Sequence, residues 1–279
     1  MTSLMRLGKY HGLGNDFLVL LDPAGSVSVS ADFVRALCHR TRGAGADGLI
    51  RASRDRASGR IRMELYNSDG TQAEMSGNGI RCLAHALLDA GWVLPGRFEI
   101  DTAAGTRALV VRSSISGLAT VEVDMGQVLT GPPHLPETMA RPPARAVGVE
   151  VGNPHLVILV EQAYELSALP IERLGPSFEI ARPGGQNVEW VRVVSPEEIE
   201  VRIWERGAGV TEACGSGSVA AAAACRYWGM TSSRVMVHNP GGDLEVILAP
   251  AGAKLVGPSA RVGTFEIAGE LLERMGVLV

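Results

Sequence analysis

The feature that most constrains this chain is a pair of similar segments separated by 138 residues (214 − 76). Ser76-Gly77-Asn78-Gly79 in the first segment corresponds to Cys214-Gly215-Ser216-Gly217 in the second. The same spacing relates further landmarks, namely Gly14-Asn15 with Gly152-Asn153, Tyr66 with Trp204, and Gly91 with Gly229. Two unrelated glycine-rich turns would not share these landmarks, so the chain is predicted to contain two copies of one fold.

Each copy has the same internal order. Apolar residues alternate before each turn, as in a half-buried strand: Ile61, Met63 and Leu65, then Ile199, Val201 and Ile203. After each turn, an apolar stretch ends at a glycine, which predicts helices over 80–90 and 218–228. Further strands are expected at 107–112, 120–124, 156–160, 190–194, 235–238 and 244–248. The predicted fold class is α+β, with one long helix in each half.

Composition and charge exclude several classes of protein. Apolar residues make up 46% of the 279, so a packed core is expected, and the net charge of −4 with only 5% aromatic residues argues against nucleic-acid binding. The longest apolar run, 219–225, is too short to span a membrane, and the first residues lack the apolar segment of a signal peptide. A cytoplasmic protein with reduced thiols is therefore expected.

Other motifs do not indicate a cofactor or a metal. The segment 43–48 spells the dinucleotide fingerprint, but it follows a predicted helix at 31–39 and precedes no long helix. The six histidines are scattered, and no P-loop, HExxH, CxxC or GxSxG motif is present. Five prolines within 131–143 are expected to interrupt regular structure, and the crossing between the halves is placed near residue 125.

The two turns predict an anion site. Each opens a predicted helix, where unpaired N–H groups and a partial positive charge meet glycines that allow close approach. A pseudo-twofold axis would make the turns face one another, with the Ser76 and Cys214 side chains on either side of a small bound anion. The helix start is expected to lower the pKa of the Cys214 thiol, whereas Cys38, Cys82 and Cys225 are expected in the core.

Several polar residues occur near these turns in the sequence. Singly, each asparagine among them is typical of a turn. Together, the set suits a small, multiply charged molecule that resembles an amino acid. Its members are Asn15, Asn67, Asn153, His155, Asn187, Glu205 and Arg206.

The motifs that contain these residues resemble those of the diaminopimelate epimerases, in the same order over nearly the whole chain. They are His11-Gly12-Leu13-Gly14-Asn15-Asp16-Phe17, Tyr66-Asn67-Ser68-Asp69-Gly70, Gly77-Asn78-Gly79-Ile80-Arg81-Cys82, Gly152-Asn153-Pro154-His155, Trp204-Glu205-Arg206-Gly207 and Ala213-Cys214-Gly215-Ser216-Gly217.

The resemblance implies an isomerase that needs neither pyridoxal phosphate nor any other cofactor. Such an enzyme interconverts LL- and meso-2,6-diaminopimelate in lysine and peptidoglycan precursor synthesis, and is commonly a homodimer. The implied fold has two similar domains, each a mixed sheet wrapped around a central helix, with the site in the cleft between them. On this basis the first half is predicted to span 1–124, with 264–279 returning to it, and the second half 125–263.

The resemblance also implies roles for individual residues. Cys214 falls on the second catalytic thiol, and His155 lies beside the site. The reacting α-carboxylate would be held at Gly77-Asn78 and Gly215-Ser216. The substrate-binding positions are Asn15, Asn67, Asn153, Asn187, Glu205 and Arg206.

Two positions depart from the family pattern. Ser76 stands where the family has its first catalytic cysteine, and Gly48 where a glutamine is common, which puts one polar contact in doubt. A serine hydroxyl is a far weaker acid than a thiol and titrates close to water, so the rate is expected to fall by at least the ~10²–10⁴-fold that an acid–base group contributes.

The consequence of Ser76 stays open at this point. It is an engineered replacement that traps a substrate complex, a natural variant with weak or altered activity, or a site where a neighbour such as His155 supplies the proton transfer. One-sided chemistry, with Cys214 as the only competent base, is a related hypothesis. The alternative functions are an epimerase, racemase or dehydratase of another amino acid with the same fold, and a non-catalytic amino-acid-binding protein.

Overall fold

The structure is a computed structural model that describes residues 5–137, 139, 143–161 and 166–269. The chain divides into two compact units, Met1–Val123 with Pro258–Val279, and Asp124–Gly257. The first boundary lies one residue before the predicted one, and the chain rejoins the first unit at 258 rather than 264. The reason is strand β17 (Gly252–Ile267), which pairs first with β16 and then, from Ala260 onward, with β1.

The first unit contains two α-helices and a sheet that β17 completes. Its elements are β1 (Met5–Gly12), β2 (Asn15–Leu21), α1 (Ala31–Cys38), β3 (Gly48–Arg54), β4 (Ile61–Asn67), β5 (Gln72–Ala73), α2 (Gly77–Asp89), β6 (Gly96–Thr102), β7 (Gly105–Ile115) and β8 (Leu118–Gly126).

The second unit repeats this order. Its elements are β9 (Leu129–Gly131), β10 (Ala146–Glu150), β11 (Pro154–Leu159), the short 3-10 helix η1 (Leu166–Ala168), α3 (Ile171–Glu179), β12 (Asn187–Ser195), β13 (Glu198–Glu205), β14 (Gly209–Thr211), α4 (Gly215–Tyr227), β15 (Arg234–Asn239) and β16 (Gly242–Ala249).

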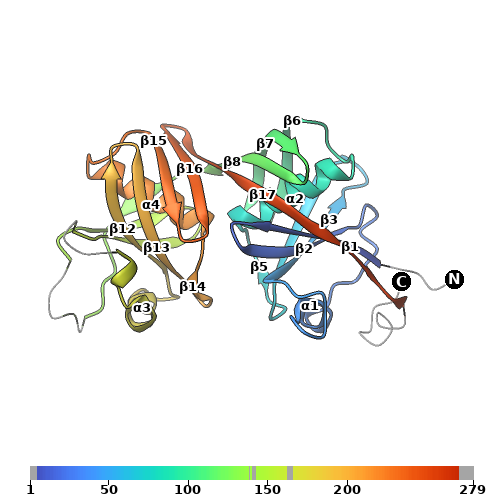
Figure 1. Ribbon diagram of the computed structural model, residues 1–279, viewed down its shortest axis with the longest axis horizontal. Coiled ribbons are helices and arrows are strands. Elements are labelled where there is room, and N and C mark those ends of the chain that lie inside the picture. The colour runs from blue at the N-terminus through green and yellow to red at the C-terminus, as the bar shows by residue number, and fades with distance from the viewer. Residues whose placement is uncertain (1–4, 138, 140–142, 162–165, 270–279) are drawn as a thin grey trace. The chain divides into compact units, whose positions relative to one another are not determined.

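The strand pairings repeat as well as the element order. In the first unit the parallel pairs are β2 with β3 and β4 with β6, and in the second they are β11 with β12 and β13 with β15. Helices α2 and α4 each have 13 residues and begin 138 positions apart. Strands surround each of these helices within its own unit (Figure 1). The predicted α+β class with a mixed sheet around a central helix is confirmed.

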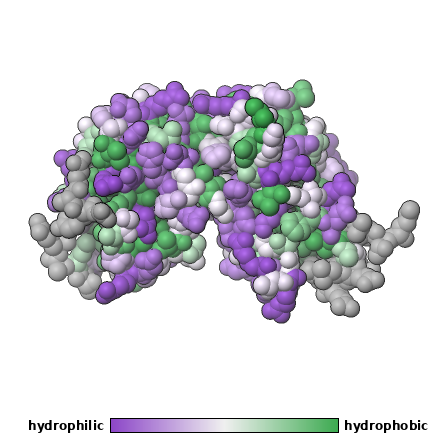
Figure 2. Space-filling model, viewed as in Figure 1, coloured by the Kyte–Doolittle hydropathy of each residue, from purple (hydrophilic) through white to green (hydrophobic). Residues whose placement is uncertain are grey.

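Burial explains why these two helices are central. Helix α2 buries every residue from Gly77 to Leu87, as expected of a helix enclosed by strands rather than lying on a surface. Both helices begin three residues before the predicted starts, because Ser76 and Cys214 cap turns whose glycines are already helical. Hydrophilic residues cover most of the visible face of each unit, with smaller hydrophobic patches between them (Figure 2).

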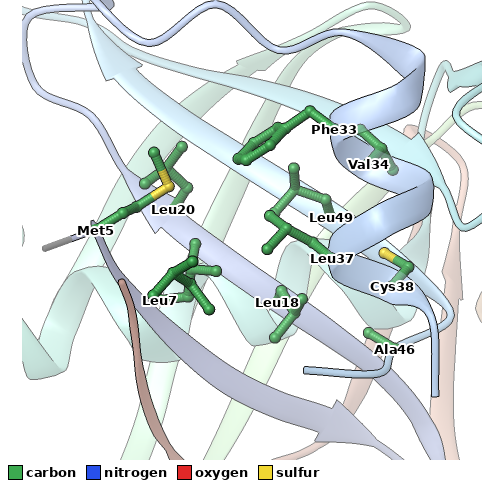
Figure 3. Close-up of a cluster of buried hydrophobic side chains, with 11 residues drawn as sticks. Met5, Leu7, Leu18, Leu20, Phe33, Val34, Leu37, Cys38, Ala46 and Leu49 are labelled. Carbon is green, nitrogen blue, oxygen red and sulfur yellow. The ribbon is translucent and has the colours of Figure 1, made fainter. Parts of the chain in front are cut away.

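The shorter helices extend the two cores. Helix α1, capped by Ser30, packs Phe33 and Leu37 against apolar side chains of β1, β2 and β3, including Leu18 and Leu49 (Figure 3). Helix α3, which the sequence did not predict, packs Phe178 edge to face against Trp190 of β12. Strand β9 ends at Gly131, where the proline-rich stretch begins, and residues 138 and 140–142 of that stretch lie outside the described residues.

The described part of the chain contains neither a membrane-spanning helix nor a metal-binding cluster. There, no helix is both long and apolar enough to cross a membrane, and no group of histidine, cysteine, aspartate and glutamate side chains could hold a metal ion. Gly48 begins strand β3, so a strand and not a helix follows the dinucleotide-like segment.

Packing of α3 against β13 yields a test of the fold. A methyl group at Gly175 would lie 2.1 Å from Cδ2 of Trp204, the residue before Glu205. Gly175→Ala is expected to destabilise the protein by about 1–3 kcal/mol, as overpacking of a core does. Gly131→Ala is the matched control, because nothing lies within 4 Å of the added methyl there. Chemical denaturation measures both, and equal stability of the two variants would contradict the packing.

Candidate active site

The first turn is built by a side chain that caps α2. Ser76 Oγ accepts a hydrogen bond from the Gly79 N–H at 3.0 Å, and the Ser76 carbonyl accepts one from Ile80 at 2.9 Å. Among the described residues, the Gly77 N–H has no partner. A helix start with an open N–H and no side chain at that position can hold an anion.

A buried arginine supports this turn from below. Arg81 is fully buried, and its guanidinium donates to the Gly77 carbonyl at 2.9 Å, to Asn78 Oδ1 at 2.9 Å and to the Pro258 carbonyl at 3.2 Å. Burial lowers the pKa of Arg81 to about 10, so the group is still a cation at neutral pH. No carboxylate of the described residues lies within ion-pair distance of it. Arg81 therefore places positive charge beneath the predicted carboxylate cradle.

A chain of hydrogen bonds orients the amides beside the turn. Asn78 Nδ2 donates to Asn15 Oδ1 at 3.3 Å, and Asn15 Nδ2 donates to Asp47 Oδ2 at 2.9 Å. Arg40 holds the other oxygen of Asp47 at 2.6 Å. The structure thus brings Asn15 and Asn78 together. The amide of Asn67 instead donates to Thr71 Oγ1 at 3.0 Å.

The second turn repeats the first with sulfur in place of oxygen. Cys214 caps α4, and its Sγ accepts from the Gly217 N–H at 3.5 Å and lies 3.5 Å from Ser216 Oγ. The Gly215 and Ser216 N–H groups have no partner within the described part of the chain. The turn therefore offers two open donors beside the Cys214 thiol.

The expected pKa of Cys214 was wrong in direction. Burial raises the pKa of the Cys214 thiol well above its usual value, and the negative charge of Glu205 raises it further. The hydrogen bonds from Ser216 and Gly217 lower the pKa, but each has a smaller effect than burial or the charge of Glu205. Cys214 is therefore a protonated thiol at neutral pH in the substrate-free protein.

The remaining polar residues of the second unit form two groups. In the first, Asn187 Oδ1 accepts from the Arg206 N–H at 2.9 Å, and Arg206 Nη1 donates to the Gly184 carbonyl at 3.0 Å. In the second, His155 lies between Asn153 Oδ1 at 2.9 Å and Glu189 Oε1 at 2.7 Å. Glu205 ends β13, before the loop that carries Arg206.

Sequence analysis missed the residues that support the site. Arg81 was detectable as a charged residue inside an apolar helical stretch. Glu189 was detectable as an acidic residue in a strand whose neighbours are apolar on both sides. Asp47 gave no signal, because an aspartate before glycine is typical of any turn.

Comparison with known proteins identifies the family. The family model described as diaminopimelate epimerase matches residues 7–130 and 147–262. The chain belongs to the diaminopimelate epimerase family. Relatives of this name include one from Synechococcus sp. (strain JA-3-3Ab), 39% identical over 267 residues, 88% of this chain and 91% of the relative. Another, from Thermobifida fusca (strain YX), is 39% identical over 280 residues, 94% and 98% of the two chains.

Solved structures share the fold at low sequence identity. A PhzF-family phenazine biosynthesis protein from Bacillus anthracis has a TM-score of 0.70 at 14% identity, covering 95% of this chain and 99% of that one. A hydroxyproline epimerase from Agrobacterium vitis has a TM-score of 0.69 at 16% identity, covering 95% and 92%. These likenesses show the fold alone.

The raised pKa of Cys214 predicts the pH dependence of its alkylation. The thiolate is the reactive form, and a raised pKa keeps it rare until the pH exceeds about 9. The alkylation rate, followed by peptide mass spectrometry, is expected to keep rising through pH 9. A plateau below pH 8 would show that the helix start dominates over burial. Cys38, Cys82 and Cys225, each buried with its pKa raised to about 12, are the internal controls for unreactive thiols.

Proposed function

We propose that this chain epimerises LL-2,6-diaminopimelate to the meso form, without a cofactor, in lysine and peptidoglycan precursor synthesis. Family membership supports the substrate and the reaction. The observation that carries the mechanism is the duplicated capped turn, with an oxygen at Ser76 and a sulfur at Cys214 in equivalent positions. Inversion of a carbon needs a base on one face and an acid on the other, and two related turns can supply that pair.

The reacting α-carboxylate is proposed to bind at the two helix starts. Gly77-Asn78 and Gly215-Ser216 present backbone N–H groups, and those of Gly77, Gly215 and Ser216 have no partner among the described residues. Hydrogen bonds from these groups stabilise the negative charge that moves onto the carboxylate when the α-proton leaves. The cation of Arg81, which hydrogen-bonds the carbonyl of Gly77, adds to that stabilisation in the first unit.

The remaining polar residues are proposed to hold the other groups of the substrate. Its distal end carries an ammonium and a carboxylate, for which an acid, an arginine and amides are suitable partners. Asn153 and His155 belong to the same site, near the reacting end. The distal set is Asn15, Asn67, Asn187, Glu205 and Arg206.

Substrate binding is proposed to activate Cys214. The charge of Glu205 raises the pKa of the Cys214 thiol in the free protein. An ammonium group bound near Glu205 offsets that charge, and the pKa falls toward the range in which the thiolate forms. Cys214 then takes the α-proton, a carbanion forms, and a proton returns to carbon to complete the exchange.

Ser76 is proposed to impair the return of a proton from the opposite face. Its hydroxyl is a far weaker acid than a thiol, so Cys214 is the only competent group in the pair. The family resemblance supports a homodimer in the cytoplasm, and analytical ultracentrifugation tests the oligomeric state.

Replacing the serine tests the function directly. Ser76→Cys keeps a capping group, as Cys214 shows for α4, and restores the acid. Epimerisation of LL-diaminopimelate is expected to rise by about 100-fold or more. Ser76→Ala is the control, since it removes both the acid and the cap, and should be no faster than the parent.

Two results would overturn parts of the proposal. A rise below tenfold in Ser76→Cys would show that Ser76 does not limit the rate. Calorimetric binding of diaminopimelate without turnover in Ser76→Cys would indicate a binding protein in place of an enzyme.

A further inference from the structure

A buried polar group lies within the second unit, behind the turn that carries Cys214. The side chains of His155 and Glu189 are both 0% exposed, and His155 Nδ1 lies 2.7 Å from Glu189 Oε1. The other ring nitrogen, Nε2, lies 2.9 Å from Asn153 Oδ1. Because water does not reach these buried groups, they must form hydrogen bonds with one another. Each hydrogen bond needs one proton, so the bonds show how many protons the group carries.

The proton count fixes the form of His155. An amide oxygen only accepts, so the bond to Asn153 requires a proton on Nε2. The bond between Nδ1 and Glu189 then requires one further proton, shared between nitrogen and oxygen. The pair is therefore neutral overall, as an imidazole with a carboxylic acid or an imidazolium with a carboxylate.

Two observations favour the carboxylic acid. Glu189 Oε2 is buried and has no hydrogen-bond partner among the described residues, which is costly for a carboxylate. Burial also raises the pKa of Glu189 above its usual value. His155 is accordingly a neutral ring with its proton on Nε2 and its Nδ1 accepting from Glu189.

The oxygen of Glu189 that contacts His155 also lies close to the second turn. A methyl group at Gly217, in the first turn of α4, would lie 2.7 Å from Glu189 Oε1. The carboxyl group is thus enclosed between the His155 ring and the turn capped by Cys214.

We propose that Glu189 is a positioning residue that fixes the ring of His155 and, through it, the amide of Asn153. With Oδ1 of Asn153 occupied by the ring, its Nδ2 is the group left to donate to a substrate carboxylate. Without Glu189, the ring can carry its proton on Nδ1, and Asn153 can then turn its oxygen toward that carboxylate. This inference rests on the proposed function for the role of Asn153, but not for the state of His155.

The test compares two replacements of Glu189 in the full chain. Glu189→Gln keeps a donor to Nδ1, as a carboxylic acid does, whereas Glu189→Leu removes it at similar size. Nitrogen-15 NMR of the substrate-free protein reports which ring nitrogen of His155 carries the proton. The parent and Glu189→Gln are expected to show Nε2–H, and Glu189→Leu to lose that preference.

Kinetics in the Ser76→Cys background supply the second readout. Glu189→Leu is expected to raise KM for diaminopimelate by roughly tenfold or more, the factor for losing a bond to a charged group, with a smaller effect on kcat. Glu189→Gln should stay within a few-fold of the parent. Glu197→Gln, an exposed position just after β12, is the matched control for the change of acid to amide.

The outcomes separate the two proposals. A His155 ring that is doubly protonated, or protonated on Nδ1 alone, in the parent protein would overturn the positioning role even if Glu189→Leu does not fold. An unchanged KM in a folded Glu189→Leu would overturn it as well. The Ser76→Cys variant can fail to turn over diaminopimelate while NMR still shows the His155 proton on Nε2 in the parent and its loss from Nε2 in Glu189→Leu. In that case the proposed function is wrong, but the positioning of His155 by Glu189 is confirmed.

Discussion

The cap at the start of each long helix is the interaction on which the site depends. A serine oxygen in one unit and a cysteine sulfur in the other accept the N–H three residues further along the chain. A cap of this kind contributes on the order of 1 kcal/mol to a helix. Its larger effect here is geometric, because the capping atom is the same atom that would carry out proton transfer. The helix therefore fixes the reactive group and the open N–H donors together.

The two turns have the same backbone conformation but differ in the ionisable side chains that lie next to them. A buried cation, Arg81, supports the first turn, whereas Glu189 and the ring of His155 support the second. Positive charge beneath the first turn favours a bound carboxylate. Burial and the charge of Glu205 raise the pKa of Cys214 at the second turn and keep the thiol protonated until substrate arrives. The duplication thus produced two equivalent frameworks with different electrostatics.

The sequence predicted the elements that a local pattern determines. It did not predict burial, or contacts between residues that are far apart in the chain. The offset of 138 residues located both helices, because a repeat preserves its glycines and its apolar periodicity. Helix α3 was missed since Pro176 lies inside it and its apolar face is short. The pKa of Cys214 was given the wrong sign because the helix start is visible in the sequence, but the burial of the thiol is not. The contact between Glu189 and His155 joins strands 34 residues apart, and the sequence offers no spacing rule for it.

Hydrogen exchange at the α-carbon tests most directly whether Cys214 is the only competent base. LL- and meso-diaminopimelate are incubated separately with the protein in D₂O, and proton NMR follows the loss of the α-hydrogen signal. Exchange is expected from one isomer at least tenfold faster than from the other, with its configuration retained. Equal exchange from both isomers would contradict the assignment and show that the Ser76 side exchanges protons as readily as the Cys214 side.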